Sequence, residues 1–324
     1  MTRPAKPLTE KTGVITTVSD RHENFAAAET PDWCRGCGDF GILRALENAL
    51  AGLGLHPREV MVFGGIGCSG KTPYYLAANG IHTLHGRVLP FATGAKLANP
   101  ALTVIAAGGD GDGLSIGAGH FVNAGRRNLD LTYLFYNNEV YGLTKGQAAP
   151  TLPQGAQTRG MAAPNPQRPL EPIGLALDAG YTWIGRGYAY GLGELTELIT
   201  RAIRHPGLAF LEILQPCPHY HPDHDKSWFA PRLYTPVDHD PRLDSDDPDR
   251  RAALHAAVRR LGAERGERIA TGVFLEDTAT APFAIALHQR QPAWPENPPA
   301  TTPLADAEGY PLARIDTLLD GFTV

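Results

Sequence analysis

The chain has 324 residues, of which 43% are apolar and 19% charged, and its formal net charge is −5. These proportions are typical of a folded globular protein and exclude a disordered chain. The acidic balance and the absence of long lysine or arginine runs argue against a nucleic-acid-binding surface. Met1 to Val14 lack the apolar core of a signal peptide, and no apolar stretch reaches the roughly 18 residues of a membrane span. We therefore expect a cytoplasmic protein that binds neither nucleic acid nor membrane.

The expected elements alternate between helices and strands. Hydrophobic periodicity predicts helices over 38–53, 91–99, 114–126, 173–179 and 192–205. Short apolar runs predict strands over 60–63, 102–107, 131–136, 181–185 and 208–214. This alternation is typical of the α/β class, and it predicts a doubly wound, mostly parallel sheet.

Composition divides the chain into three parts. Residues 1–30 form a loose lead-in, and residues 31–240 carry the alternating pattern. After residue 240 the pattern weakens to one helix, 250–261, and one strand, 271–276, before a proline-rich tail. We interpret residues 241–324 as a C-terminal extension that serves as a partner-binding arm.

Two of the predicted strands end in polar residues that are suited to a metal. The strand 102–107 leads into Gly-Gly-Asp-Gly, and the strand 131–136 ends in Asn-Asn, which places Asn138 28 residues after Asp110. With a helix between them they form a βαβ unit, whose parallel strands end on the same edge of the sheet. A carboxylate and an amide oxygen suit Mg²⁺, which commonly also binds phosphate. The glycines beside Asp110 permit close approach of a bulky anion.

Four cysteines can reach the same edge. Cys34 and Cys37 form a C-x-x-C pair ahead of a helix, whereas Cys68 and Cys217 each follow a predicted strand. Converging thiolates bind Zn²⁺ or an iron–sulfur cluster. One close pair with two distant single cysteines favours the cluster, because structural zinc sites usually consist of two close pairs. Four unrelated thiols, with C-x-x-C as a redox pair, remain an alternative.

A nucleotide-binding motif competes with this interpretation. Gly65 to Thr72 matches the P-loop pattern and follows a strand, with Asp110 as a candidate magnesium partner. A P-loop requires a helix that begins at its Lys-Thr, but the turn signal Asn79-Gly80 follows almost at once. Two G-x-G-x-x-G matches predict dinucleotide binding less well, because neither has a clear acidic ribose ligand.

Several cationic side chains lie near these motifs. Lys71 can hold a substrate carboxylate, and Lys145 lies in a long Gly- and Pro-rich loop, 142–172, that can reach the same ligand. His85 can contact a phosphate or play a structural role. His219, His221 and His224 form H-x-H-x-x-H, which we interpret as a polar loop rather than a metal site, because no carboxylate pattern accompanies them.

Six stretches, in order along the chain, carry a resemblance to a known family. They read WCRGCGDFGIL, GIGCSGK, HTLHGRVLPFATGAKLANP, GGDGDGLSIGAGHFVNAGRRN, NNEVYGLTKGQAAPT and QPCPHY. Together they resemble the β subunit of the 2-oxoacid:ferredoxin oxidoreductases from about Asp32 to Tyr220. Two short stretches depart from the family pattern. Ala149 replaces a common serine, and His-Tyr-His follows Cys217-Pro218 where Thr-x-Asn is usual.

The resemblance implies three cofactors: thiamine diphosphate, Mg²⁺ and one [4Fe–4S] cluster. It places the cluster on Cys34, Cys37, Cys68 and Cys217. It places Mg²⁺ on Asp110, Asn138 and the carbonyl of Val140, and the substrate carboxylate on Lys71, with Leu143 and Lys145 as further catalytic-site residues. The remaining cofactor-binding residues it implies are Gly67, His85, Gly109, Gly111, Asp112 and Gly142.

The implied reaction is oxidative decarboxylation of a 2-oxoacid, such as 2-oxoglutarate or a pyruvate-like acid. Coenzyme A takes the acyl group, and electrons pass through the cluster to ferredoxin. The chain offers no candidate for the glutamate that activates thiamine, so the resemblance implies an α subunit in an αβ or (αβ)₂ assembly. A P-loop nucleotide hydrolase and a non-catalytic metal- or cluster-binding module remain the alternatives.

Overall fold

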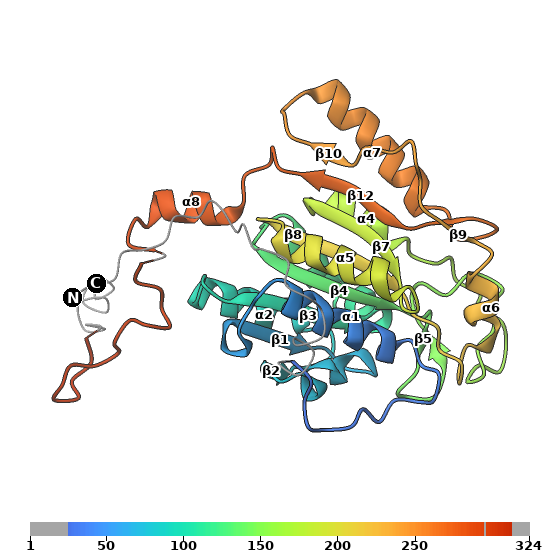
Figure 1. Cartoon of the computed structure of the whole chain (residues 1–324), viewed down its shortest axis with the longest axis horizontal. Helices are drawn as coiled ribbons and strands as arrows, with labels where there is room; N and C mark the ends of the chain where they lie inside the picture. Colours follow the sequence, from blue (N-terminus) through green and yellow to red (C-terminus); the bar gives the residue numbers. More distant parts are fainter. Residues whose placement is uncertain (1–24, 295, 313–324) are drawn as a thin grey trace, which may run out of the picture.

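The computed structural model describes residues 25–294 and 296–312, built around one central sheet with helices on both faces (Figure 1). The expectation for Met1 to Val14 falls outside these residues. No helix in the two described ranges is both long and apolar enough to cross a membrane.

The sheet has eight strands in the order β10-β12-β7-β8-β4-β3-β1-β2. All neighbouring strands run parallel except β12 and β7, which are antiparallel. The strand bounds are β1 Val60–Gly64, β2 Asn79–His82, β3 Thr103–Gly109, β4 Leu131–Asn137, β7 Trp183–Tyr188, β8 Leu208–Leu214, β10 Arg242–Leu243 and β12 Gly272–Asp277. The expected doubly wound, mostly parallel sheet is thus confirmed.

Short strands pair outside this sheet. β5 (Val140–Tyr141) pairs with β6 (Gln147–Ala148), and β9 (Leu233–Tyr234) pairs with β11 (Ile269–Ala270). The β5–β6 ribbon directly follows β4, and it folds the chain beyond Asn138 back over the end of the sheet.

Two helix layers cover the sheet. One contains α1 (Asp39–Gly52) and α5 (Leu192–Arg204). The other contains α2 (Val88–Ala98), α3 (Ala118–Gly125), α4 (Pro172–Ala179) and α7 (Pro248–Gly262). Successive side chains of a strand point to opposite faces, so β4 serves both cores: Leu134 and Tyr136 join the first, Tyr133 and Phe135 the second. Burial on both faces explains why apolar and aromatic residues make up most of β4.

One local expectation holds in part and another was wrong. The helix expected over 114–126 is present but interrupted: a π-helix, Asp112–Ile116, precedes α3, and Ser115 inside the π-helix departs from helical geometry with φ −95° and ψ −105°. Asn79-Gly80, taken as a turn, begins β2, which pairs with β1. The Asn79 side-chain amide donates to the carbonyls of Arg58 and Val60. Tertiary pairing therefore overrides the local turn preference.

The chain beyond residue 240 has two parts. Up to Asp277 it adds β10, α7 and β12 to the sheet and its core, where Leu254, Val258 and Phe274 are buried. Beyond it, α8 (Phe283–Arg290) and the following residues lead away from the sheet (Figure 1). The Trp294 indole anchors this arm by donating to the carbonyl of Leu97 at the end of α2.

Candidate functional site

A cavity of about 360 Å³ opens at the carboxyl edge, the edge where the parallel strands β1, β3, β4 and β8 end. Ligands of open α/β sheets bind at this kind of edge. Most residues predicted from the sequence line the cavity, namely Gly67, Cys68, His85, Gly109, Asp110, Gly111, Asn138, Val140, Gly142 and Leu143. The structure therefore brings together residues from the ends of four strands, β1, β2, β3 and β4.

Asp110 is buried at the floor of this cavity. Its Oδ2 accepts hydrogen bonds from the Glu139 backbone, at 2.9 Å, and the Thr151 hydroxyl, at 2.5 Å. Burial raises the pKa of Asp110 to about 7, although the Thr151 hydrogen bond opposes this. A cation beside the carboxylate reverses the effect of burial and keeps the group ionised. The buried carboxylate thus fits a metal ligand.

Asn138 lies opposite, at the end of β4. Its Oδ1 accepts a hydrogen bond from the Val140 backbone at 3.1 Å, and its Nδ2 donates to Gln215 Oε1 at 2.7 Å. These contacts fix the orientation of the amide, and Asn138 lines the same cavity as Asp110. Both residues offer oxygen ligands, and oxygen ligands suit Mg²⁺.

Asp112 has a different position from Asp110, although both were predicted to contact the cofactor. It does not line the cavity. Its Oδ1 accepts from the backbones of Ile66, at 3.0 Å, and Gly86, at 2.7 Å, and lies 3.0 Å from His85 Nδ1. Asp112 therefore ties together the two loops that follow β1 and β2, and it acts on the cavity by positioning them.

Gly111 is a glycine because of close packing. A Cβ there would lie 2.3 Å from an atom of the Tyr141 ring, whose hydroxyl donates to the Gly111 carbonyl. A side chain at Gly111 would push the β5–β6 ribbon away from Asp110. Gly111 therefore lets Tyr141 pack against the cavity wall, in addition to permitting close approach of a ligand.

The four cysteines gather beside the cavity. Cys68 and Cys217 both face Gly142, where a Cβ would lie 3.5 Å and 3.7 Å from their sulfurs. Cys37 accepts a hydrogen bond from Gln215 Nε2 at 3.3 Å. Cys34 lies in the same turn as Cys37, closed by the Cys37 N–H to Cys34 carbonyl hydrogen bond. The sequence spacing correctly predicted that the four thiols lie at one edge.

The spacing of these sulfurs bears on which group they bind. In the described residues, no three of the four thiols lie within 4.8 Å of one another. Thiolates on one tetrahedral Zn²⁺ lie roughly 3.8 Å apart, because each Zn–S bond is about 2.3 Å long. Burial raises the pKa of Cys37 and Cys68, and the negative charge of Asp39 adds to the effect. These thiols therefore remain neutral unless a positively charged group binds them and stabilises the thiolates.

Lys71 pairs with a carboxylate from another segment. Its Nζ lies 2.8 Å and 2.9 Å from the two oxygens of Asp32, which also accepts from the Tyr75 hydroxyl at 2.6 Å. This pair raises the pKa of Lys71 and lowers that of Asp32. Lys71 is a cation beside Cys68, but its side chain is paired with Asp32 and does not line the cavity.

The structure contradicts the P-loop interpretation. A 3₁₀ helix, Ser69–Tyr75, follows the loop, and no α-helix begins at Lys71-Thr72. The helix N-terminus that would bind phosphate is therefore missing at this loop. Lys145, predicted as a catalytic residue, is exposed and does not line the cavity, whereas Leu143 lines it and is 47% exposed.

Two residues that support the site escaped the sequence analysis. Thr151 lies within hydrogen-bond distance of Asp110 and, at 2.9 Å, of Asn137 Oδ1. Gln215 links Asn138 to Cys37. Gln215 follows β8 just as Asn138 follows β4, so its place in the chain was the available signal.

The family is decided by comparison with known proteins. Residues 65–213 match the model of the C-terminal thiamine pyrophosphate-binding domain of thiamine pyrophosphate enzymes. The 2-oxoacid:ferredoxin oxidoreductase subunit beta of Saccharolobus solfataricus is 46% identical over 301 residues, covering 90% of this chain and 96% of the relative. This chain belongs to the 2-oxoacid:ferredoxin oxidoreductase β-subunit family.

Further relatives of this family agree. Subunit beta of 2-oxoacid:ferredoxin oxidoreductase 1 from Aeropyrum pernix is 46% identical, covering 88% of this chain and 90% of the relative. A solved 2-oxoglutarate:ferredoxin oxidoreductase from Magnetococcus marinus, with 2-oxoglutarate, coenzyme A and succinyl-CoA bound, superimposes with a TM-score of 0.77. It is 29% identical, and the match covers 96% of this chain and 99% of that one.

Membership of the oxidoreductase family settles the general activity. The chain is the β subunit of an oxidoreductase complex that acts on 2-oxoacids, and it carries a thiamine diphosphate-binding domain. The name of the subunit also implies an α partner. The nucleotide hydrolase and the non-catalytic module are thereby set aside.

Proposed function

We propose that the carboxyl edge of this chain holds a Mg²⁺–diphosphate half-site and a [4Fe–4S] cluster side by side. Asp110, Asn138 and the Val140 carbonyl would bind Mg²⁺, and Cys34, Cys37, Cys68 and Cys217 would bind the cluster. The observation that carries the proposal is Gly142, which lines the cavity while facing the sulfurs of Cys68 and Cys217. The proposed Mg²⁺–diphosphate site and the cysteine thiols are therefore both next to Gly142.

The reaction that we propose is 2-oxoacid + coenzyme A + two oxidised ferredoxins giving acyl-CoA + CO₂ + H⁺ + two reduced ferredoxins. Thiamine diphosphate supplies the electron sink for loss of CO₂, and the cluster accepts electrons one at a time. The substrate class follows the names of the relatives, which include a 2-oxoglutarate oxidoreductase subunit from Mycobacterium tuberculosis. A 2-oxoacid such as 2-oxoglutarate therefore suits the site.

Residues of this chain would bind and orient the substrate. Lys71 would hold the substrate carboxylate in place of its present partner Asp32, because it follows Cys68 and Ser69, which line the cavity, in the same short helix. Leu143, on the cavity wall, offers an apolar contact, and His85 is held beside the cavity by Asp112. Exchange of Asp32 for the substrate keeps Lys71 paired in both states.

A partner subunit would complete the cavity. The activating glutamate of thiamine enzymes has no candidate among the described residues that line the cavity, where the only carboxylate is that of Asp110. Closure by an α subunit would bring the glutamate and exclude water. We propose a soluble, cytoplasmic αβ or (αβ)₂ assembly that passes electrons to ferredoxin.

Replacement of Asp110 tests the half-site. Asp110→Ala removes a buried ligand of the metal that bridges protein and diphosphate, so we expect thiamine diphosphate binding in the presence of Mg²⁺ to be lost. Calorimetric titration of the αβ complex measures this. The control is Asp238→Ala, an exposed aspartate outside the cavity. Tight binding retained by Asp110→Ala would refute the assignment.

A further inference from the structure

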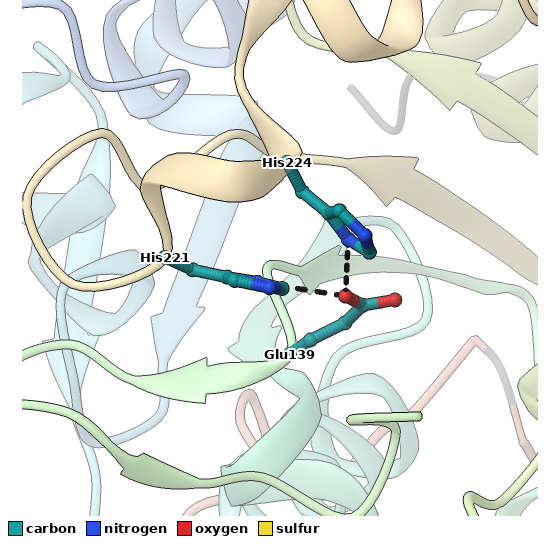
Figure 2. Close-up of side chains that lie close together, drawn as sticks. All are labelled: Glu139, His221 and His224. Atoms are coloured by element: carbon teal, nitrogen blue, oxygen red, sulfur yellow. Dashed lines mark hydrogen bonds and ion pairs between the residues drawn. The ribbon is translucent and has the colours of Figure 1, made fainter. Parts of the chain in front are cut away.

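Three side chains outside the cavity converge on one point. Figure 2 shows His221 and His224, from the loop after Cys217, pointing at the carboxylate of Glu139. The ligand atoms of all three residues lie within 4.8 Å of one another. His224 Nδ1 is 2.7 Å from Glu139 Oε2, and His221 Nδ1 is 3.5 Å from the same oxygen.

Backbone hydrogen bonds and ring stacking hold the three side chains in this arrangement. His221 donates its backbone N–H to the Cys217 carbonyl at 2.9 Å, and a 3₁₀ turn, Pro222–His224, places the second histidine beside the first. The His224 ring stacks on Trp228 at a centroid distance of 3.9 Å. Glu139 lies between Asn138 and Val140, with a left-handed φ of 65°. The three donors are therefore fixed before any ligand arrives.

The Glu139 side chain has only histidines as positive partners. It is 13% exposed, and in the described part of the chain it forms no ion pair with a lysine or arginine. His221 Nδ1 also lies 3.3 Å from the carbonyl oxygen of Asn138, so one ring nitrogen faces two oxygens. A largely buried carboxylate is stabilised by positive charge. A cation bound by the three donors would supply that charge while both histidines stay neutral.

We propose that Glu139, His221 and His224 form a binding site for a divalent transition-metal ion such as Zn²⁺. Two imidazole nitrogens and one carboxylate oxygen are preferred zinc donors, whereas Mg²⁺ and Ca²⁺ take oxygen ligands. Donors on one tetrahedral Zn²⁺ lie roughly 3.3 Å apart. The separations of 2.7 Å and 3.5 Å lie on either side of that value. Three protein ligands leave a fourth position for water.

The site joins two loops that matter to the proposed function, although the inference does not rest on that function. Glu139 belongs to the loop of Asn138 and Val140, and the histidines belong to the loop of Cys217. A bound ion holds these loops together from outside the cavity. In the family pattern that the sequence resembles, asparagine is usual at the position of His221.

Zinc binding to the full-length chain tests the proposal. The chain is purified anaerobically with its iron and sulfide, equilibrated with Zn²⁺ and freed of excess ion. We expect one Zn²⁺ per chain, with nitrogen and oxygen but no sulfur ligands by X-ray absorption at the zinc edge. His221→Asn restores the usual residue, so it preserves the fold while binding Zn²⁺ at least about tenfold more weakly.

The matched control is His219→Thr, which also restores a usual residue of the same loop but lies outside the three donors. Its zinc content should equal that of the wild type. Equal zinc in His221→Asn and wild type, no zinc in the wild type, or a sulfur-ligated ion would each overturn the proposal. The absorption measurement on the wild type needs no variant, and the iron content reports separately on the cluster.

Discussion

Two aspartates two residues apart take unlike roles because of where their side chains point. Asp110 follows β3 into the cavity, where burial raises its pKa to about 7. Asp112 turns into the protein and accepts backbone N–H groups of Ile66 and Gly86. We therefore expect that a cation decides the protonation of Asp110, whereas Asp112 maintains the shape of two loops.

Lys71 is predicted to govern substrate affinity. Lys71→Met removes the ammonium group that we assign to the substrate carboxylate. A hydrogen bond to a charged group contributes about 1.5–3 kcal/mol, so KM for the 2-oxoacid should rise roughly 10- to 100-fold. Steady-state assays of the αβ complex with ferredoxin as acceptor measure the change.

The control for Lys71 is Lys226→Met, an exposed lysine that lies over the Tyr190 ring, away from the cavity. It should leave KM unchanged. Affinity for thiamine diphosphate should also stay the same in Lys71→Met. If KM for the 2-oxoacid is the same in Lys71→Met as in the wild type, Lys71 does not bind the substrate.

The location of a residue could be predicted from the sequence where the residue lies next to the end of a recognisable strand or helix. Asp110, Asn138 and the cysteines each follow or precede a recognisable element, so their meeting at one edge could be inferred. Glu139 could not be joined to the histidines, because a left-handed φ and a 3₁₀ turn set their directions. The histidines were therefore interpreted as a polar loop.

The end of β8 connects the two halves of the site. Gln215 donates to Cys37 Sγ and accepts from Asn138, and its own backbone N–H donates to the Asn137 carbonyl at 2.9 Å. One buried amide thus spans the proposed metal ligand and the proposed cluster ligand.

Replacement of Gln215 should change the cluster without removing it. Gln215→Leu loses the N–H···S hydrogen bond, and such bonds favour the reduced cluster. We expect a more negative midpoint potential and weaker Mg²⁺ binding, with unchanged iron content. A redox titration followed by electron paramagnetic resonance measures the potential. Gln154→Leu, on the exposed loop, is the control, and an identical potential in both variants contradicts the link.

Most elements were predicted to within a few residues because β-branched and aromatic runs set the buried strands. The exceptions were elements defined by contacts. β2 forms because it pairs with β1, and β12 joins the same sheet by pairing antiparallel to β7. Such pairings are not encoded in local periodicity, so the sequence alone placed residues 241–277 outside the main fold.

The whole molecule is organised around one edge of one sheet. Parallel strands place their carboxyl ends together, and the helix layers leave that edge open. The cavity is therefore bounded on one side by this chain and open on the other, as a half-site requires. The arm that begins at α8 extends away from the sheet (Figure 1). An extended arm suits contact with a partner chain.

Reduction of ferredoxin by the reconstituted αβ complex tests the central claim most directly. Under anaerobic conditions with 2-oxoglutarate, coenzyme A, Mg²⁺ and thiamine diphosphate, we predict ferredoxin reduction that needs both subunits. Cys217→Ala should abolish it while leaving thiamine diphosphate binding intact. Full reduction by Cys217→Ala, or reduction by the wild-type complex that does not depend on a 2-oxoacid, would contradict the account.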